Sequence, residues 1–174
     1  MRDTSIRPTF DKIWTEFATA LAERSTCART GVGCVIVTED NHRVLSIGYN
    51  GGARGLNNSC DSAEPGNCGC LHAEENALIK MNFNEPSPKK MYTTLAPCLM
   101  CAKRAVNAGI QEVIYITAYR KTEGIELLEK AGVKVRQYQA PPNEKPCASC
   151  GWEEWRHYRS CPTPKVKAYG GPPG

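Results

Sequence analysis

The chain of 174 residues lacks any run of about eighteen apolar residues, so no segment predicts a membrane-spanning helix. Its first eight residues, MRDTSIRP, also lack the apolar segment that a signal peptide needs. We therefore expect a cytoplasmic location and no membrane partner. A formal net charge of +4 without a basic stripe argues against a nucleic-acid polymer as partner, although a single phosphate could still be bound.

Cysteine, by contrast, is abundant, with ten in the chain. In a secreted protein an even number of cysteines would suggest a disulfide framework. Disulfides rarely persist in a reducing cytosol, and no export signal is expected here. Metal ligation is the natural alternative, because a thiolate is a strong, soft ligand for zinc.

The hydrophobic pattern predicts a layered α/β domain with a mixed sheet of five strands. An amphipathic helix is expected over residues 9–24, with Thr9 or Asp11 as its cap. Further helices are expected over residues 72–81, 97–108 and 123–131, the last with Gly132 as C-cap, and strands over 32–38, 43–49, 89–95, 112–117 and 133–138. Residues 1–138 then form one domain, and residues 139–174 form a C-terminal extension rich in Cys, Pro and Gly.

Two short motifs indicate the chemistry: HAE at residues 72–74 and PCLMC at residues 97–101. Together they match the H-x-E…P-C-x-x-C signature of zinc deaminases. Cys98 and Cys101 are expected in one helical turn, with Pro97 at the first helical position, where the helix N-terminus favours thiolates. With His72 as a third ligand, the fourth tetrahedral position is left for water, as in catalytic zinc sites.

Glu74 is the candidate proton shuttle of this site. Zinc lowers the pKa of its bound water, so that a nearby carboxylate can take the proton. The water would attack the amino-bearing carbon of a cytosine ring, while Glu74 protonates the adjacent ring nitrogen and then the leaving amino group. A lone C-x-x-C could be a redox pair or half of a structural zinc site, and a lone H-x-E a solvated helix face, but their joint occurrence favours catalysis.

The chain resembles the deoxycytidylate (dCMP) deaminase family, within the cytidine deaminase-like superfamily, over about residues 9–138. The resemblance rests on RSTCAR at residues 24–29, GYNG at 48–51, HAEENA at 72–77 and MYTTLAPC at 91–98. It implies a three-layer α/β/α fold and the zinc-dependent conversion of dCMP to dUMP and ammonia. It also implies a homo-oligomer, because relatives assemble as hexamers.

The resemblance assigns three candidate substrate residues. Asn50 would hold the sugar, Arg29 would bind the phosphate with its guanidinium fork, and Ala73 is a further substrate-binding candidate. Considered without the resemblance, Arg29 could equally be a surface arginine and Asn50 a turn residue.

A regulatory nucleotide site is implied near Tyr49, Asn50, Gly51 and Arg54. In the family dCTP activates and dTTP inhibits at this place. A bound regulatory triphosphate would be accompanied by Mg²⁺. Many relatives have proline where this chain has Ala53, although Arg54 and Gly55 match them.

Four further cysteines form a candidate second zinc site. Many relatives carry an extra structural zinc held partly by histidines, and Cys68 and Cys70 occupy the places of those histidines. Together with Cys27 and Cys60 they could close an all-thiolate tetrahedral site, the alternative being four unligated thiols. Cys34, in an apolar strand, is expected to be a small core residue.

The C-terminal extension holds a candidate third zinc site. Its spacing of ligand residues is that of a compact zinc knuckle, and the alternative is an appendage without metal. The four candidate ligands are Cys147, Cys150, His157 and Cys161.

Other functions compete with dCMP deamination. The substrate could be a modified cytosine nucleotide, such as 5-methyl- or 5-hydroxymethyl-dCMP, or another base, although the GYNG segment argues against purines. A polynucleotide editor would need a basic, aromatic-lined groove, which the sequence does not indicate. A non-catalytic zinc-stabilised binding module would have no use for Glu74, and a redox protein would not explain His72.

Overall fold

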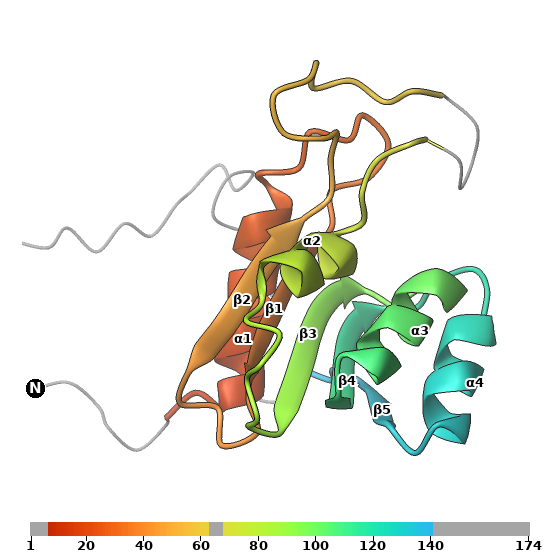
Figure 1. Ribbon diagram of the computed structural model, residues 1–174. Coiled ribbons are helices and arrows are strands. Elements are labelled where there is room, and N and C mark those ends of the chain that lie inside the picture. The colour runs from red at the N-terminus through yellow and green to blue at the C-terminus, as the bar shows by residue number, and fades with distance from the viewer. Residues whose placement is uncertain (1–6, 63–67, 141–174) are drawn as a thin grey trace, which may run out of the picture. The chain divides into compact units, whose positions relative to one another are not determined.

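The computed structural model describes residues 7–62 and 68–140 (Figure 1). This part of the chain forms a five-stranded sheet with helices on both faces, as the sequence predicts. The elements in chain order are α1 (Phe10–Ala22), β1 (Gly33–Thr38), β2 (Val44–Tyr49), α2 (Ala73–Lys80), β3 (Lys89–Leu95), α3 (Leu99–Asn107), β4 (Ile110–Thr117), α4 (Glu123–Lys130) and β5 (Lys134–Gln137).

The sheet is mixed, with the strand order β2-β1-β3-β4-β5. β1 pairs with β2 and β3 in antiparallel fashion, whereas β3, β4 and β5 are parallel. Because β3 and β4 run side by side in the same direction, the loops that follow them lie at the same edge of the sheet. This edge carries the candidate site described below.

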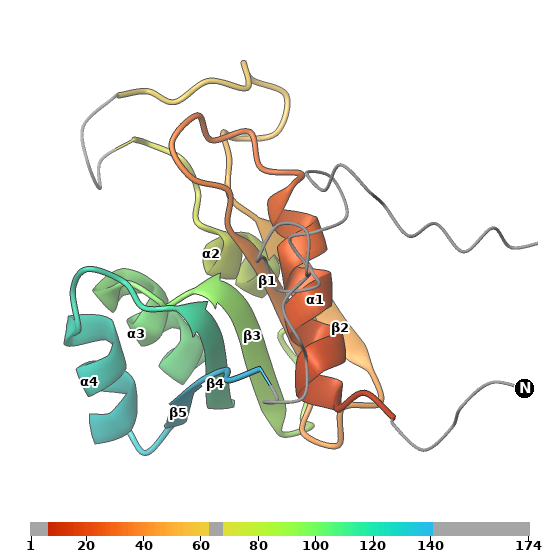
Figure 2. The same cartoon turned by 180° about the vertical axis from the view of Figure 1, so that it is seen from behind.

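The core lies on both faces of the central strand β1, all of whose residues are buried. Cys34 and Ile36 pack in the cluster that includes residues of α2, α3 and α4, and Val35 and Val37 pack in the cluster beneath α1. Figure 1 shows α2 and α3 in front of the sheet, and Figure 2 shows α1 on the opposite face. The predicted three-layer arrangement is therefore confirmed, and so is the core position of Cys34.

Element ends coincide with the predicted ends or differ from them by one or two residues. Thr9 is the N-cap of α1, and its hydroxyl accepts a hydrogen bond from the backbone N–H of Lys12 at 3.2 Å. Gly132, with φ of +80°, follows the C-cap Ala131 of α4, so it supplies the left-handed turn that ends the helix.

The predicted place of Pro97 in a helix is wrong. α3 begins at Leu99, and Cys98 is its N-cap in extended conformation, with φ −70° and ψ 168°. The chain is still extended before this point, because the backbone N–H of Ala96 donates to the carbonyl of Thr117 in β4. Pro97 therefore precedes the helix and its cap.

No helix in the described part of the chain is long and apolar enough to cross a membrane. The candidate third zinc site, formed by Cys147, Cys150, His157 and Cys161, lies outside the described residues. The division of the chain into residues 1–138 and 139–174 stays a prediction for the same reason.

Candidate active site

The residues of the two sequence motifs come together at the N-termini of α2 and α3. The Nδ1 atom of His72 lies 3.5 Å from the sulfur of Cys98 and 3.4 Å from the sulfur of Cys101. His72 and Cys98 are the N-caps of their helices, and neither makes a side-chain capping hydrogen bond. Their ligand atoms are therefore directed at one another instead of at the helix ends.

Hydrogen bonds and an ion pair hold the two helices in place. The side-chain amide of Asn76, in α2, donates to the carbonyl of Tyr49 at the end of β2, at 2.9 Å. Between the helices, the Arg104 guanidinium lies 3.2 Å from the Glu75 carboxylate. The ligand residues of α2 and α3 thus belong to one packed unit.

The Glu74 side chain is only 4% exposed and lines the same cavity as His72. Burial raises the pKa of Glu74 to about 7, because loss of solvation outweighs the lowering by its own backbone N–H and by the charge of His72. A carboxyl group whose pKa lies near neutrality can both accept and donate a proton.

The two cysteines of the motif differ in acidity. The hydrogen bond from the Cys101 thiol lowers the pKa of Cys98 to about 3, against the opposing effect of burial, and the hydrogen bond to His72 adds to the lowering. The same bond to Cys98 raises the pKa of Cys101, as does burial. Cys98 therefore ionises first and presents a thiolate beside His72.

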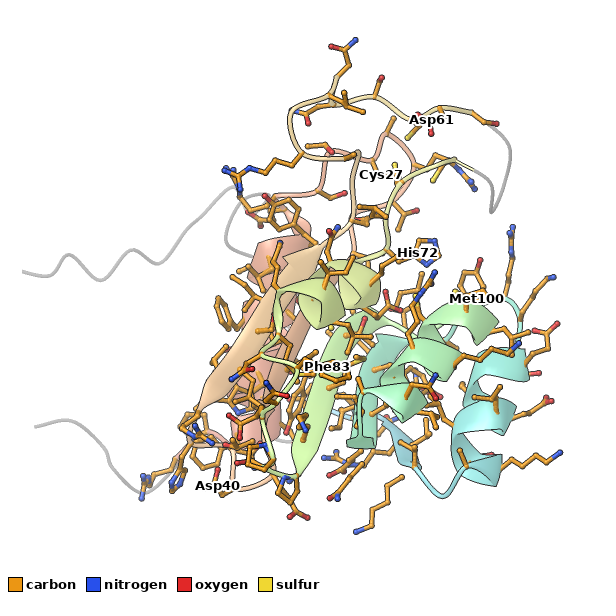
Figure 3. All side chains as sticks on the ribbon, in the orientation of Figure 1. Cys27, Asp40, Asp61, His72, Phe83 and Met100 are labelled. Carbon is orange, nitrogen blue, oxygen red and sulfur yellow. The ribbon has the colours of Figure 1, made fainter. Side chains whose placement is uncertain are left out.

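The four cysteines predicted for a second site also come together. The sulfur of Cys60 lies 3.7 Å from that of Cys27 and 3.6 Å from that of Cys70, and the sulfurs of Cys27 and Cys68 are 3.9 Å apart. Figure 3 shows Cys27 close to His72, at the end of the domain opposite Asp40. We name these four residues the four-cysteine cluster.

The donor atoms of both groups fit a tetrahedral zinc ion. Zinc lies about 2.0 Å from nitrogen and about 2.3 Å from sulfur, which puts N···S pairs about 3.5 Å apart and S···S pairs about 3.8 Å apart. The distances from His72 to its two cysteines and those within the four-cysteine cluster are close to these values. The first group has three protein ligands and the second has four.

A cavity of about 290 Å³ joins the two groups, and Glu74 and His72 line it together with three thiols of the four-cysteine cluster. Of the predicted substrate residues, Arg29, Asn50 and Ala73 line it as well. The structure thus brings all three to one place.

Asn50 makes more contacts than the sequence indicates. Its side-chain oxygen accepts from the backbone N–H of Val32 at 2.7 Å, and its amide nitrogen donates to the carbonyl of Thr30 at 2.8 Å. One N–H and one lone pair of the side-chain amide are not used by these bonds. Asn50 therefore holds the loop around residue 30 and can still offer one donor and one acceptor to a ligand.

Among the residues of the cavity wall, Arg120 was not selected from the sequence. Arg120 and Tyr119 follow the end of β4, and the Arg120 guanidinium lies 5.6 Å from the centre of the Tyr119 ring. Tyr115, within β4, is not part of the wall. The position of Arg120 after a parallel strand next to β3 is the signal that could have identified it.

Of the residues predicted for a regulatory site, Asn50 lines this cavity, and Tyr49 and Gly51 are its neighbours in sequence. Gly51 is buried and pairs with Leu71 through backbone hydrogen bonds, whereas Arg54 is exposed. Tyr49 is partly buried at the end of β2, with the ammonium of Lys80 5.6 Å from its ring centre.

The fold and the site together define a zinc-site α/β domain of the cytidine deaminase-like class. A family model described as the cytidine and deoxycytidylate deaminase zinc-binding region matches residues 8–117. The chain therefore belongs to the cytidine and deoxycytidylate deaminase family.

Individual relatives agree with this assignment. The chain is 39% identical over 151 residues to the deoxycytidylate deaminase of Schizosaccharomyces pombe and 39% identical over 145 residues to that of Saccharomyces cerevisiae. These matches cover 79% and 76% of the chain, and the chain spans about half (46%) of each relative. The crystal structure of the dCMP deaminase of cyanophage S-TIM5 with dCMP and dUMP has a TM-score of 0.67 and 31% identity, covering 76% of this chain and 99% of that one.

Proposed function

We propose that the chain deaminates dCMP, or a close cytosine nucleotide, by hydrolysis to dUMP and ammonia. The observation that carries the proposal is the buried Glu74 carboxyl group beside a three-ligand nitrogen and sulfur set in a cavity. Family membership and the similarity to a dCMP deaminase that binds dCMP and dUMP support the choice of substrate.

His72, Cys98 and Cys101 would hold the catalytic zinc, which when bound supplies a Lewis acid that activates water. Glu74 is proposed to accept the proton of that water on its carboxylate. As the water oxygen adds to the amino-bearing carbon, the same carboxyl group would give this proton to the adjacent ring nitrogen. The carboxylate would then take the second proton from the added oxygen and pass it to the amino group, which leaves as ammonia while the carbonyl forms. Its pKa of about 7 suits both directions of transfer.

The cavity wall suggests how the nucleotide is bound. Arg29 is proposed to bind the phosphate, with Arg120 as a second cation on the same cavity. Asn50 would contact the sugar through the donor and acceptor that its backbone partners leave unused. Ala73, which lines the cavity, would contact the base.

The four-cysteine cluster is proposed to hold a second, structural zinc. Four thiolates closing a tetrahedron leave no position for water, which is the arrangement of structural sites. The sulfur distances of 3.6 to 3.9 Å support this assignment.

Control by nucleotide triphosphates is part of the same proposal. Binding of dCTP or dTTP with Mg²⁺ near Tyr49, Asn50, Gly51 and Arg54 would alter activity in a homo-oligomer, taken to be a hexamer. Rate curves for dCMP with each triphosphate, together with the mass of the assembly in solution, test this; rates that neither triphosphate changes would contradict it.

The proposed reaction is tested by ammonia release from purified, zinc-loaded protein. The panel contains dCMP, dCTP, cytidine, 5-methyl-dCMP, guanine and single-stranded DNA. We expect turnover of the cytosine monophosphates only, and the preferred base decides whether the cytosine is modified. Release from none of them would contradict the proposal and favour a non-catalytic zinc module.

Glu74→Gln is the matched control in this assay. It keeps the shape of the side chain but cannot shuttle protons, so we expect turnover to fall by about 10³-fold. The zinc content, measured by elemental analysis, should not change. A fully active variant, or one without zinc, would remove Glu74 from the proposed role.

A further inference from the structure

The loop of residues 25–32 is held by contacts that converge on Asn50 and Cys27. The Ser25 hydroxyl and the backbone N–H of Thr26 both donate to the carbonyl of Asn50, and the backbone N–H of Asn50 donates to the carbonyl of Val32. These bonds fix both ends of the loop on β2. The middle of the loop, which carries Arg29, has two further anchors: the side-chain amide of Asn50, which donates to the carbonyl of Thr30 at 2.8 Å, and the sulfur of Cys27.

The middle of the loop is wrapped around the sulfur of Cys27. The backbone N–H groups of Thr30 and Arg29 donate hydrogen bonds to this sulfur, and the Ser25 hydroxyl accepts from the backbone N–H of Cys27 at 3.1 Å. A sulfur that accepts two N–H bonds from its own loop is pre-arranged as an anionic ligand. The backbone position of Arg29 is therefore tied to the position of the Cys27 sulfur.

The Cys27 sulfur is in turn held by a distant segment of the chain. Its partners in the four-cysteine cluster, Cys60 and Cys68, lie 33 and 41 positions away in sequence. Cys27 and Arg29 line the cavity with Glu74, whereas Cys60 is not part of its wall. A change at Cys60 can thus reach the cavity through the cluster without altering the wall itself.

We propose that the four-cysteine cluster positions Arg29 for the substrate phosphate, and so determines the preference of the site for a monophosphate over the nucleoside. Withdrawing one thiol would release the Cys27 sulfur, and with it one of the anchors of the loop that carries Arg29. A cation on a loosened loop loses more conformational entropy when it binds an anion, so affinity for the phosphate falls. The inference rests on the proposed function, because it assigns the phosphate to Arg29.

The test compares the full-length wild-type chain with Cys60→Ser, Cys60→His and Ser59→Ala. Zinc per chain is counted by elemental analysis, and dissociation constants for dUMP, deoxyuridine and inorganic phosphate are measured by calorimetry. In Cys60→Ser we expect one zinc fewer per chain and about tenfold weaker binding of dUMP relative to deoxyuridine, as for a lost charged hydrogen bond. Cys60→His offers another zinc ligand and should retain both the metal and the preference. Ser59→Ala, at an exposed neighbour, controls for changes in the loop.

Two results would overturn the inference. One is loss of zinc with an unchanged preference for dUMP, which would make the cluster a structural clamp only. The other is an unchanged zinc content in Cys60→Ser, which would mean that the cluster holds no metal. If Cys60→Ser does not fold, the same two quantities are measured in Cys60→His. The inference requires that this variant either keeps both its zinc content and its preference for dUMP or loses both. Failure of the proposed function is separate, since it would show as a wild-type chain that neither deaminates dCMP nor prefers dUMP over deoxyuridine.

Discussion

At the scale of single residues, Asp11 shows how one charge ties distant elements together. Its carboxylate accepts hydrogen bonds from the Tyr92 hydroxyl at 2.8 Å and from the Arg136 guanidinium at 2.9 Å, in the first turn of α1. Burial acts to raise the pKa of Asp11, but the bonds from Arg136 and Tyr92, with the charge of Arg136, outweigh it and lower the pKa. The ionised carboxylate is therefore the form that the folded state favours.

We predict that Asp11→Asn lowers the free energy of unfolding by about 1 kcal/mol at pH 7, a value reduced because the side chain is partly exposed. A carboxyl group with a lowered folded pKa stabilises the fold above its unfolded pKa of about 3.9, and this stabilisation is lost as the pH falls through the folded value. Urea unfolding of variant and wild type should therefore differ at pH 7, and the difference should shrink as the pH falls below about 4 and through the lowered folded pKa. A difference that does not change with pH would mean that hydrogen-bond geometry, not charge, is what the variant loses.

At the scale of elements, helix α2, which carries Glu74, packs closely on strand β2. The Ser46 hydroxyl donates to the carbonyl of Ala77 at 2.6 Å, and the Asn76 amide donates to the carbonyl of Tyr49. Gly48 lies between them, and a Cβ there would overlap the carbonyl oxygen of Ala73. The close approach of α2 to β2 therefore requires glycine at position 48.

We predict that Asn76→Ala lowers the free energy of unfolding by about 1 kcal/mol and kcat by about tenfold or more. The variant loses the anchor that holds the start of α2 at the end of β2, so Glu74 moves relative to the cavity. Zinc content should stay unchanged. Asn84→Ala, in the exposed loop after α2, is the matched control. Equal kcat values in the two variants would show that the Asn76 bond has no part in positioning Glu74.

At the scale of the whole molecule, the described domain has two parts that are held together by different interactions. The sheet and its helices are held by apolar clusters and strand pairing. The segments at the cavity end, which carry Cys27, Cys60, Cys68 and Cys70, have little regular structure. These segments are held together mainly by the four thiols, whereas the sheet does not depend on them.

We predict that chelation of zinc abolishes turnover and loosens the cavity end while the central strands persist. Metal binding contributes directly to the folding of such segments, whereas β1 and β3 keep their hydrogen-bonded neighbours. Hydrogen exchange followed by mass spectrometry should show faster exchange in residues 25–32, 50–62 and 68–72 and little change in β1 and β3. Uniform loss of protection, or no loss, would mean that the two parts are not stabilised by different interactions.

Much of the fold follows from local pattern. Apolar spacing predicted α1, and a short apolar, β-branched run predicted β1, because these signals depend on neighbours a few positions apart. The HAE and PCLMC motifs, in this order, were also sufficient to predict the catalytic zinc site, since zinc-dependent deamination requires this combination of ligands and carboxylate. The start of α3 was misplaced because the extended pairing of Ala96 with β4 overrides the preference of Pro97 for a first helical turn.

The sequence alone therefore predicted the element order, the family and the residues that come together in the two candidate metal sites of the described residues. Only the tertiary structure decided the burial of Glu74, the place of Arg120 on the cavity wall and the bonds that Asn50 makes to its own backbone. These features depend on contacts between segments far apart in the chain. Such contacts are set by the strand order β2-β1-β3-β4-β5, because it brings the ends of β2, β3 and β4 and the thiols of distant loops to one cavity.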